Sequence, residues 1–286
     1  MYKISNNSIE FLDFLVTKRN NMTKKNISIT EIAKRLESLM EQGVVGIKQS
    51  FEDEGVILED VLKIKKLCDS LNLQINIKIG GCEAISDLNN SMMMGASGIV
   101  APMIESEFAL EKFIESIISN TNDLGRSSTD FFINIESKTA IENLNKILSS
   151  PSSKLLKGIV VGRSDLTKSF GYGKQQVNSK EICKIVKNTF IEAKSYNFKT
   201  IMGGNIGHSS IKFIEELIAE NLLDKIETRN VIVDLSKSGT KDMDDLIKDA
   251  LLFESQWMQY KAQFYNDIGE SYIKRSKVIL DRISIR

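Results

Sequence analysis

The sequence lacks most of the residues on which common catalytic and metal sites are built. Its 286 residues include one histidine, His208, three cysteines and two prolines. A zinc site with several histidines is therefore excluded, and a Ser/His/Asp or Cys/His arrangement would need His208 itself. Cys68, Cys82 and Cys183 are odd in number and widely spaced, which argues against a disulfide framework and a CxxC metal site. Any chemistry depends on carboxylates, lysines, arginines or a hard metal.

An excess of either charge is also absent, because 38 lysines and arginines balance 38 acidic residues. No overall cationic field draws this chain onto nucleic acid or an anionic membrane. No run approaches the roughly 18 apolar residues of a membrane span, and the N-terminal MYKISNNSIE lacks the basic-then-apolar order of a signal peptide. We expect a cytoplasmic protein that binds neither nucleic acid nor membranes.

Nothing in the sequence resembles a linker between domains, since there are few prolines and no low-complexity tract. We expect one catalytic domain over residues 1–240 and a helical C-terminal extension over residues 241–286. Apolar residues at helical spacing predict an N-terminal helix at about 8–19 and a second helix from Thr30, which Gly43 ends.

After Gly43, short β-branched runs alternate with helical stretches. The seven strand candidates are Val44–Gln49, Gln74–Ile79, Gly98–Pro102, Phe131–Ile135, Gly158–Gly162, Lys199–Gly203 and Lys225–Thr228. A short, degenerate strand near Ile27 would make eight. Strands that alternate with helices of this length predict parallel pairing through right-handed crossovers.

Side-chain parity inside the strands favours a closed (β/α)8 TIM barrel. In LQINIKIGG, isoleucines on one face oppose Gln74, Asn76 and Lys78 on the other, and FFINIES alternates in a similar way. A sheet covered by helices on both faces should be apolar on both, whereas a barrel can carry polar inward side chains near its C-terminal mouth. The alternative is an open α/β sheet with a few buried polar residues.

In such a barrel, functional groups lie at the C-terminal ends of the strands. Glu136 and Asp165 end neighbouring strands and suit a hard divalent cation whose other ligands are water and substrate oxygens. Alternatively, Glu136 pairs with a lysine and Asp165 caps the following helix.

Other polar groups follow the same strand ends. Lys48 or Lys78 could in principle form a Schiff base, although a neighbouring metal site makes that redundant. Gly203 and Gly204 lie in a strand-to-helix turn, IMGGNIGHSS, whose free N–H groups could hold an anion, while a tight turn with Ser209 or Ser210 as helix cap explains the same residues. We interpret His208 as an exposed loop residue.

Two segments in this order carry a specific resemblance. GIVVGRSDLTKSFGYG, preceded by FFINIESKTAIENLNKIL, resembles the paired signature of the HpcH/HpaI aldolase and citrate lyase family, in which a strand ending in I-E-T or I-E-S precedes a G-P-S-D-L-S-x-x-x-G-Y-x-G segment. GVVGIKQSFEDEGV, INIKIGGCEAISDL and ASGIVAPMIESEFALEKF fall in the expected order, so the resemblance covers roughly residues 31–204.

The resemblance implies a TIM-barrel enzyme of the pyruvate- and phosphoenolpyruvate-binding type that uses Mg²⁺ or Mn²⁺ and makes or breaks a carbon–carbon bond. It implies that Glu136 and Asp165 ligate the metal. Lys78 occupies the strand end where many members have the arginine that grips the substrate carboxylate. Arg163 and Ser164 beside Asp165, together with Gly203 and Gly204, complete the expected substrate contacts.

Three departures from the family pattern limit the assignment. The stretch KQSFEDEG lacks the histidine that serves as base in the family's aldolases of hydroxylated keto acids, so Glu52 or Glu54 could replace it, with Lys48 beside them. Lys78 is a point charge without the bidentate fork of arginine. Arg163 replaces the usual proline, as a second anion contact or as a salt bridge to a neighbouring helix or subunit.

We expect a divalent-metal-dependent carbon–carbon lyase or aldolase that acts through the enolate of pyruvate or a related 2-keto acid. Glu52 or Lys48 would contact the electrophile or move protons. Alternatives are a lyase for acyl-CoA thioesters, an enolate-condensing enzyme of sugar biosynthesis, and a barrel that binds 2-keto acids without turnover. The long amphipathic C-terminus predicts a homo-oligomer formed through the C-terminal helices, although an arm packed on its own barrel would have the same pattern.

Overall fold

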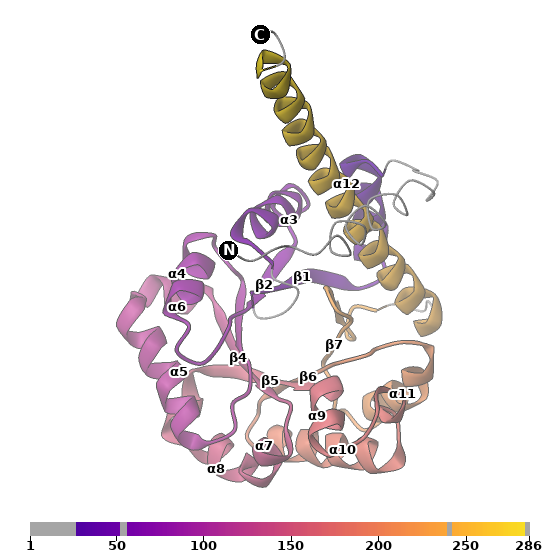
Figure 1. The fold of residues 1–286 in the computed structure, drawn as a ribbon. Coiled ribbons are helices and arrows are strands. Elements are labelled where there is room, and N and C mark those ends of the chain that lie inside the picture. The colour runs from indigo at the N-terminus through magenta and orange to yellow at the C-terminus, as the bar shows by residue number, and fades with distance from the viewer. Residues whose placement is uncertain (1–26, 52–55, 239–241, 284–286) are drawn as a thin grey trace. The chain divides into compact units, whose positions relative to one another are not determined.

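The computed structural model describes residues 27–51, 56–238 and 242–283. Eight strands in these residues close into a barrel in chain order (Figure 1). They are β1 (Val44–Ser50), β2 (Gln74–Lys78), β3 (Gly98–Ala101), β4 (Asp130–Ile135), β5 (Leu156–Gly162), β6 (Lys199–Gly203), β7 (Lys225–Glu227) and β8 (Val231–Asp234). Most contain β-branched or aromatic residues, which favour extended backbone. The predicted TIM-type barrel is confirmed.

Helices surround the barrel (Figure 1), and some of them begin at a residue whose side chain caps the first turn. Ser106 and Ser179 accept hydrogen bonds from backbone N–H groups in the first turns of α5 and α10. The α-helices are α2 (Ile29–Met40), α3 (Leu58–Ser70), α4 (Ile85–Met93), α5 (Glu107–Asn120), α6 (Asp123–Ser128), α7 (Lys138–Glu142), α8 (Leu144–Ser149), α9 (Arg163–Ser169), α10 (Lys180–Ser195), α11 (Ile211–Ala219) and α12 (Met243–Ile283), and the short 3₁₀ turns are η2 (Pro151–Leu155), η3 (Lys174–Gln176) and η4 (His208–Ser210).

Two local features depart from the helices that the sequence pattern predicts. The helical stretch after β4 is divided at Asn143 into α7 and α8, and the side-chain amide of Asn143 donates to the Glu105 carbonyl 2.9 Å away. The short helix α6 was not anticipated, because its six residues contain one large apolar side chain, Leu124, which is exposed. By contrast, Gly43 ends α2 as expected and has a left-handed φ of 102°.

The last strand runs against the others. Strands β1–β7 pair in parallel, whereas β8 is antiparallel to both β7 and β1. Only residues 228–230 separate β7 from β8, which is too short for the crossover that parallel pairing needs. The prediction of an eighth strand near Ile27 is wrong, since Ile27 lies outside the strands and Val231–Asp234 closes the barrel instead.

The interior of the barrel changes from apolar to polar along its axis. Val100, Phe132, Val160 and Ile201 form one buried cluster, in which paired strands place Val100 beside Phe132 and Val160 beside Ile201. Asn134 and Glu136 follow Phe132 at even spacing and therefore share its inward face. The parity interpretation is confirmed, because this apolar layer forms a floor below the polar side chains.

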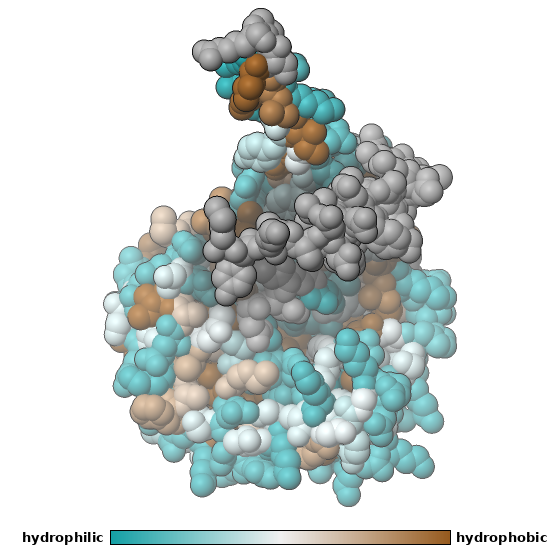
Figure 2. All heavy atoms as spheres, viewed as in Figure 1, coloured by the Kyte–Doolittle hydropathy of each residue, from teal (hydrophilic) through white to brown (hydrophobic). Residues whose placement is uncertain are grey.

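The chain divides into two compact units. Residues 32–255 form one unit, which contains the barrel and the start of α12, and residues 1–31 with 256–286 form the other. The helix predicted at 8–19 lies outside the described residues. Figure 2 shows apolar surface on the last part of α12, where Tyr272 and Ile283 are 72% and 68% exposed. None of the described helices combines the length and apolar character needed to cross a membrane.

Asp224, directly before β7, connects this strand to α10 and β6. Its carboxylate accepts hydrogen bonds from Lys194 Nζ at 2.5 Å, Thr200 N–H at 2.8 Å and Lys199 Nζ at 2.9 Å. Partial burial acts to raise its pKa, but these donors outweigh burial and lower the pKa of Asp224 to about 2. The ionised carboxylate therefore stabilises the folded barrel.

We expect Asp224→Asn to lower the free energy of unfolding at pH 7 by about 1 kcal/mol, a value reduced for partial solvent screening. The pKa of Asp224 is lower in the folded state than its ordinary value of 3.8. Its contribution to the free energy of unfolding is therefore present above pH 3.8 and is lost as the pH falls towards about 2. Urea titrations across this range should show the two proteins converging at acid pH. Asp130→Asn, at an exposed residue, should change little.

Candidate active site

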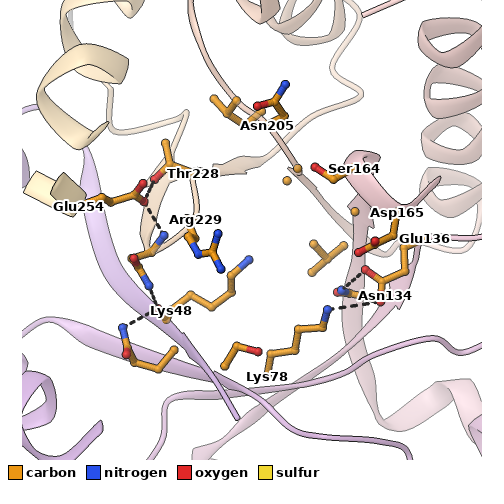
Figure 3. A pocket seen from close by; sticks show the side chains of 18 of the residues that line it. Lys48, Lys78, Asn134, Glu136, Ser164, Asp165, Asn205, Thr228, Arg229 and Glu254 are labelled. Carbon is orange, nitrogen blue, oxygen red and sulfur yellow. Dashed lines mark hydrogen bonds and ion pairs between the residues drawn. The ribbon is translucent and has the colours of Figure 1, made fainter. Parts of the chain in front are cut away.

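A cavity of about 350 Å³ opens at the mouth of the barrel, where the parallel strands end (Figure 3). It is lined by Lys48, Gln49, Ser50, Val56, Lys78, Asn134, Glu136, Val160, Gly162, Ser164, Asp165, Lys174, Gly203, Gly204, Asn205, Ile206, Thr228, Arg229, Asn230, Leu251 and Glu254. The polar ends of six strands thus meet in one space. This is the place where TIM barrels carry their chemistry.

Glu136 is held by donors on both of its carboxylate oxygens. Oε1 accepts from the Met103 N–H at 3.1 Å and lies 3.4 Å from Lys78 Nζ, and Oε2 accepts from the Asn134 side-chain amide at 2.8 Å. The Glu136 residue is only 2% exposed. Its carboxylate is therefore fixed in one orientation at the edge of the cavity.

Burial raises the pKa of Glu136 above its usual range, although Lys78 and the hydrogen bonds from Asn134 and Met103 oppose that effect. The nearby charge of Asp165 adds to the rise. Gly162, at the end of the neighbouring strand β5, has no side chain and therefore leaves space for this carboxylate. A Cβ atom added at Gly162 would lie 2.5 Å from Glu136 Oε2, too close for any side chain.

Asp165 lies in the first turn of α9 and lines the same cavity. Gly162 is the residue at the helix N-cap, so the alternative in which Asp165 caps this helix is wrong. The alternative in which Glu136 pairs with a lysine is confirmed, with Lys78 as its partner. That pair lies within the cavity, so pairing and a role in binding are compatible.

Glu136 and Asp165 are the two carboxylates of the cavity that could ligate a divalent cation. No group of three or more acidic, histidine or cysteine side chains able to hold a metal occurs in residues 27–51, 56–238 and 242–283. Magnesium, however, is commonly held by one or two carboxylates and completes its shell with water and substrate oxygens. The two carboxylates face one cavity and repel each other, since Asp165 raises the pKa of Glu136. These residues fit such an ion.

Lys48 on β1 forms a second ion pair in the barrel mouth. Its Nζ lies 2.5 Å from Oε2 of Glu227, which ends β7 and is 1% exposed. Lys48 lines the cavity, while the Glu227 carboxylate lies behind it, 3.8 Å from the position of a Cβ at Gly203. The sequence placed Glu227 at a strand end but gave no sign that Lys48 would be its partner.

The turn between β7 and β8 contributes a third set of polar groups that the sequence did not reveal. Glu254 on α12 accepts from the Thr228 hydroxyl at 2.6 Å and from the Asn230 N–H at 2.5 Å. Arg229, at the tip of the turn, points into the cavity in Figure 3. No sequence signal identifies Glu254, because the register of α12 on the barrel is set by tertiary packing.

Arg163 has a different position from the predicted one. It is completely buried and donates to the Gly203 and Gly204 carbonyls, to Asn178 Oδ1 and to Ser210 Oγ, at 2.7–3.3 Å. Burial lowers the pKa of Arg163 to about 10. The prediction that Arg163 contacts the substrate is wrong. Arg163 instead links the start of α9 to the turn after β6.

That turn contains Gly203 and Gly204, which line the cavity beside Ser164. Gly204 has a φ of 81°, and a Cβ there would lie 2.5 Å from the Ser164 nitrogen. The glycine is therefore required by backbone conformation and by the close approach of α9. Ser210 is the N-cap residue of α11, as one of the alternatives predicted, although its side chain makes no capping hydrogen bond to this helix.

The remaining candidates lie away from the cavity or outside the described residues. Glu52 and Glu54 fall within 52–55, which the structure does not describe. His208 is exposed and its Nδ1 lies 2.8 Å from Asp244 Oδ1, in agreement with its interpretation as a surface residue. Cys82 is a free, partly exposed thiol.

Comparison with known proteins supports the resemblance seen in the sequence. Residues 74–203 match the model of the HpcH/HpaI aldolase/citrate lyase family. This segment includes Lys78, Glu136 and Asp165, and the match supports a function of the aldolase or citrate-lyase type. No curated protein matches the chain.

Solved structures share the fold at low sequence identity. An HpcH/HpaI aldolase from Desulfitobacterium hafniense DCB-2 matches with a TM-score of 0.56 and 10% identity over 70% of this chain and 82% of that chain. A family protein from Burkholderia cenocepacia J2315 gives 0.56 and 13% over 71% and 84%. Citrate synthase SbnG gives 0.54 and 13% over 88% and 98%. At these identities the likeness shows the fold alone.

The raised pKa of Glu136 predicts how Glu136→Gln changes stability with pH. A carboxyl group whose pKa is higher in the folded state favours folding while it is protonated, and this contribution is lost as the pH rises from its ordinary value of 4.5 through the folded value. The glutamine variant should therefore gain stability relative to the native protein as the pH rises. Thermal unfolding at about pH 4 to 8 measures this difference. Glu142→Gln, at an exposed helix residue, should show no such trend.

Arg163→Met should destabilise the barrel by about 3 kcal/mol, because buried carbonyls and Asn178 would lose their donors. Urea unfolding measures the loss, with Arg275→Met at an exposed position of α12 as the matched control. A change as small as that of the control would contradict the tethering role.

Proposed function

We propose that this chain, in which residues 74–203 match the HpcH/HpaI aldolase/citrate lyase family, is a metal-dependent carbon–carbon lyase or aldolase. Its substrate would be pyruvate or a related 2-keto acid that reacts as the enolate. One observation carries the proposal: two carboxylates, Glu136 and Asp165, and a cation, Lys78, face one cavity from the ends of β4 and β2 and from the first turn of α9.

Lys78 would bind the carboxylate of the 2-keto acid. Its Nζ lies 3.4 Å from Glu136 Oε1, longer than a good charge-assisted hydrogen bond, and its side chain is 12% exposed. An incoming carboxylate can therefore reach this ammonium group. Since Lys78 pairs with Val100 of the apolar layer across β2 and β3, the substrate carboxylate would lie deep in the mouth.

Glu136 and Asp165 would hold a Mg²⁺ or Mn²⁺ ion. When bound, such an ion acts as a Lewis acid and stabilises the negative charge of an enolate. The hydrogen bonds from Asn134 and Met103 keep the Glu136 carboxylate oriented without help from solvent. The backbone at Gly203 and Gly204 and the hydroxyl of Ser164 border the same space and would contact the substrate.

Self-association through α12 and the cytoplasmic location stay predictions. The end of α12 exposes apolar side chains at Tyr272, Ile273, Leu280 and Ile283, which suits contact with another copy. The sedimentation coefficient of the native chain tests the assembly.

We expect the protein to exchange the methyl protons of pyruvate in heavy water when Mg²⁺ is present. Enolate formation removes a methyl proton, and its return as deuterium is seen as loss of the methyl signal by NMR. Glu136→Gln should reduce the rate at least about 100-fold, because a neutral amide is a poor ligand for a hard cation. A chelator should abolish exchange, and added Mg²⁺ should restore it.

Glu142→Gln, which alters an exposed glutamate of α7, is the matched control and should exchange like the native protein. Chelator-resistant exchange would contradict the metal requirement. Absence of exchange under all conditions, with pyruvate still bound, would instead identify a binding barrel without turnover.

A further inference from the structure

We propose that Lys48 is the proton donor to the carbonyl oxygen of the acceptor substrate, and that Glu227 is a positioning residue that fixes Lys48 for this task. The inference rests on the proposed carbon–carbon bond chemistry and assigns the half of the cavity that Glu136 and Asp165 do not serve. In Figure 3, Lys48 and Glu136 lie on opposite sides of the cavity, and the Lys48 side chain points into it.

The two lysine–glutamate pairs of the mouth are built differently. In the pair of Lys78 and Glu136, both residues line the cavity, and the charged atoms are 3.4 Å apart. In the pair of Lys48 and Glu227, the lysine lines the cavity and the carboxylate lies behind it at 2.5 Å. The first pair can open to admit a ligand, whereas the second holds its ammonium group in place.

Only one oxygen of the buried Glu227 carboxylate takes part in an ion pair within the described part of the chain, the one with Lys48. The Glu227 side chain is 1% exposed, and Oε1 has no hydrogen-bond partner among the described residues. A buried carboxylate with one free oxygen is less favourable for stability than an apolar residue of similar size. A carboxylate at the end of β7 is explained if its task is to orient Lys48.

The backbone of Lys48 is also fixed from the neighbouring strand. Its N–H donates to the Asn230 carbonyl at 2.6 Å, and its carbonyl accepts from the side-chain amides of Asn230 and Gln49 at 3.0 and 2.9 Å. Asn230 is itself held by Glu254. Hydrogen bonds therefore hold the backbone of Lys48, and the ion pair with Glu227 holds its ammonium group. The ammonium group has a defined place above the floor of the barrel.

The enolate carbon of the 2-keto acid forms a bond to the acceptor carbonyl carbon, and the π electrons of that carbonyl move to its oxygen. The oxygen takes a proton from Lys48 Nζ, which leaves a neutral amine beside the Glu227 carboxylate. The Lys48 amine then regains a proton from water. In cleavage, the neutral amine takes the hydroxyl proton and the carbon–carbon bond breaks. No histidine in the described part of the chain lines the cavity to perform this transfer.

The test uses cleavage of three 4-hydroxy-2-oxo acids, the aldol adducts of pyruvate with glycolaldehyde, acetaldehyde and glyoxylate, measured by the pyruvate released. We expect Lys48→Met to lower kcat about 100-fold with little change in KM, the range of general acid–base catalysis. Glu227→Gln should lower kcat about 10-fold at unchanged KM. Glu227→Asp, which keeps the charge on a shorter chain, should recover part of that loss.

Asp60→Asn is the matched control, because Asp60 is a buried carboxylate on α3 that lies 3.6 Å from Lys63 and away from the cavity. It should cleave like the native protein. Unchanged kcat in Lys48→Met, or a loss in Glu227→Gln confined to KM, would overturn the inference.

Two further results separate this inference from the proposed function. Pyruvate exchange by the native protein without cleavage of any adduct would overturn the inference and leave the enolate chemistry intact, whereas loss of both would overturn both. Borohydride treatment with pyruvate should leave Lys48 unmodified. A reduced pyruvyl adduct on Lys48, found by peptide mass spectrometry, would show a Schiff base and overturn the proton-donor role.

Discussion

The barrel mouth depends on keeping negative charge buried beside positive charge. Glu136 and Glu227 are 2% and 1% exposed, and each has a lysine from another strand beside it. An isolated carboxylate in such a place would lose its charge or destabilise the fold by several kcal/mol. Because the lysines come from β1 and β2 and the glutamates from the ends of β4 and β7, the pairs form only when the barrel closes in one register.

Closure in that register requires the reversed last strand. The three residues between β7 and β8 return the chain at the mouth, so β8 descends beside β1 and leaves the barrel at the opposite end. Helix α12 then carries Glu254 back to the mouth, where it binds the turn that presents Arg229. One departure from a regular barrel thus brings the start of the C-terminal helix into the wall of the cavity.

Much of this arrangement follows from the sequence, and the reasons for the rest are physical. Alternation in residues 73–79 and 131–136 predicted which side chains point inward, because strand parity is a local property. Val231–Asp234 was missed because three apolar residues followed by an aspartate form too short a run to stand out as a strand. Arg163 was misassigned because a charged residue beside a strand end looks identical whether it faces a cavity or buried carbonyls. The partners of Lys48 and the contacts of Glu254 depend on packing between distant segments.

The absence of a side chain at residue 162 also couples two positions that are far apart in the sequence. The Glu136 carboxylate occupies the volume where a Cβ of that residue would lie, so the two positions cannot vary independently. A descendant that acquired even alanine there would have to move or give up the acid, and one that gave up the acid would be released from the need for glycine. Residues 136 and 162 therefore behave as one unit in mutagenesis: the effect of a side chain at 162 should depend on whether the acid at 136 is present.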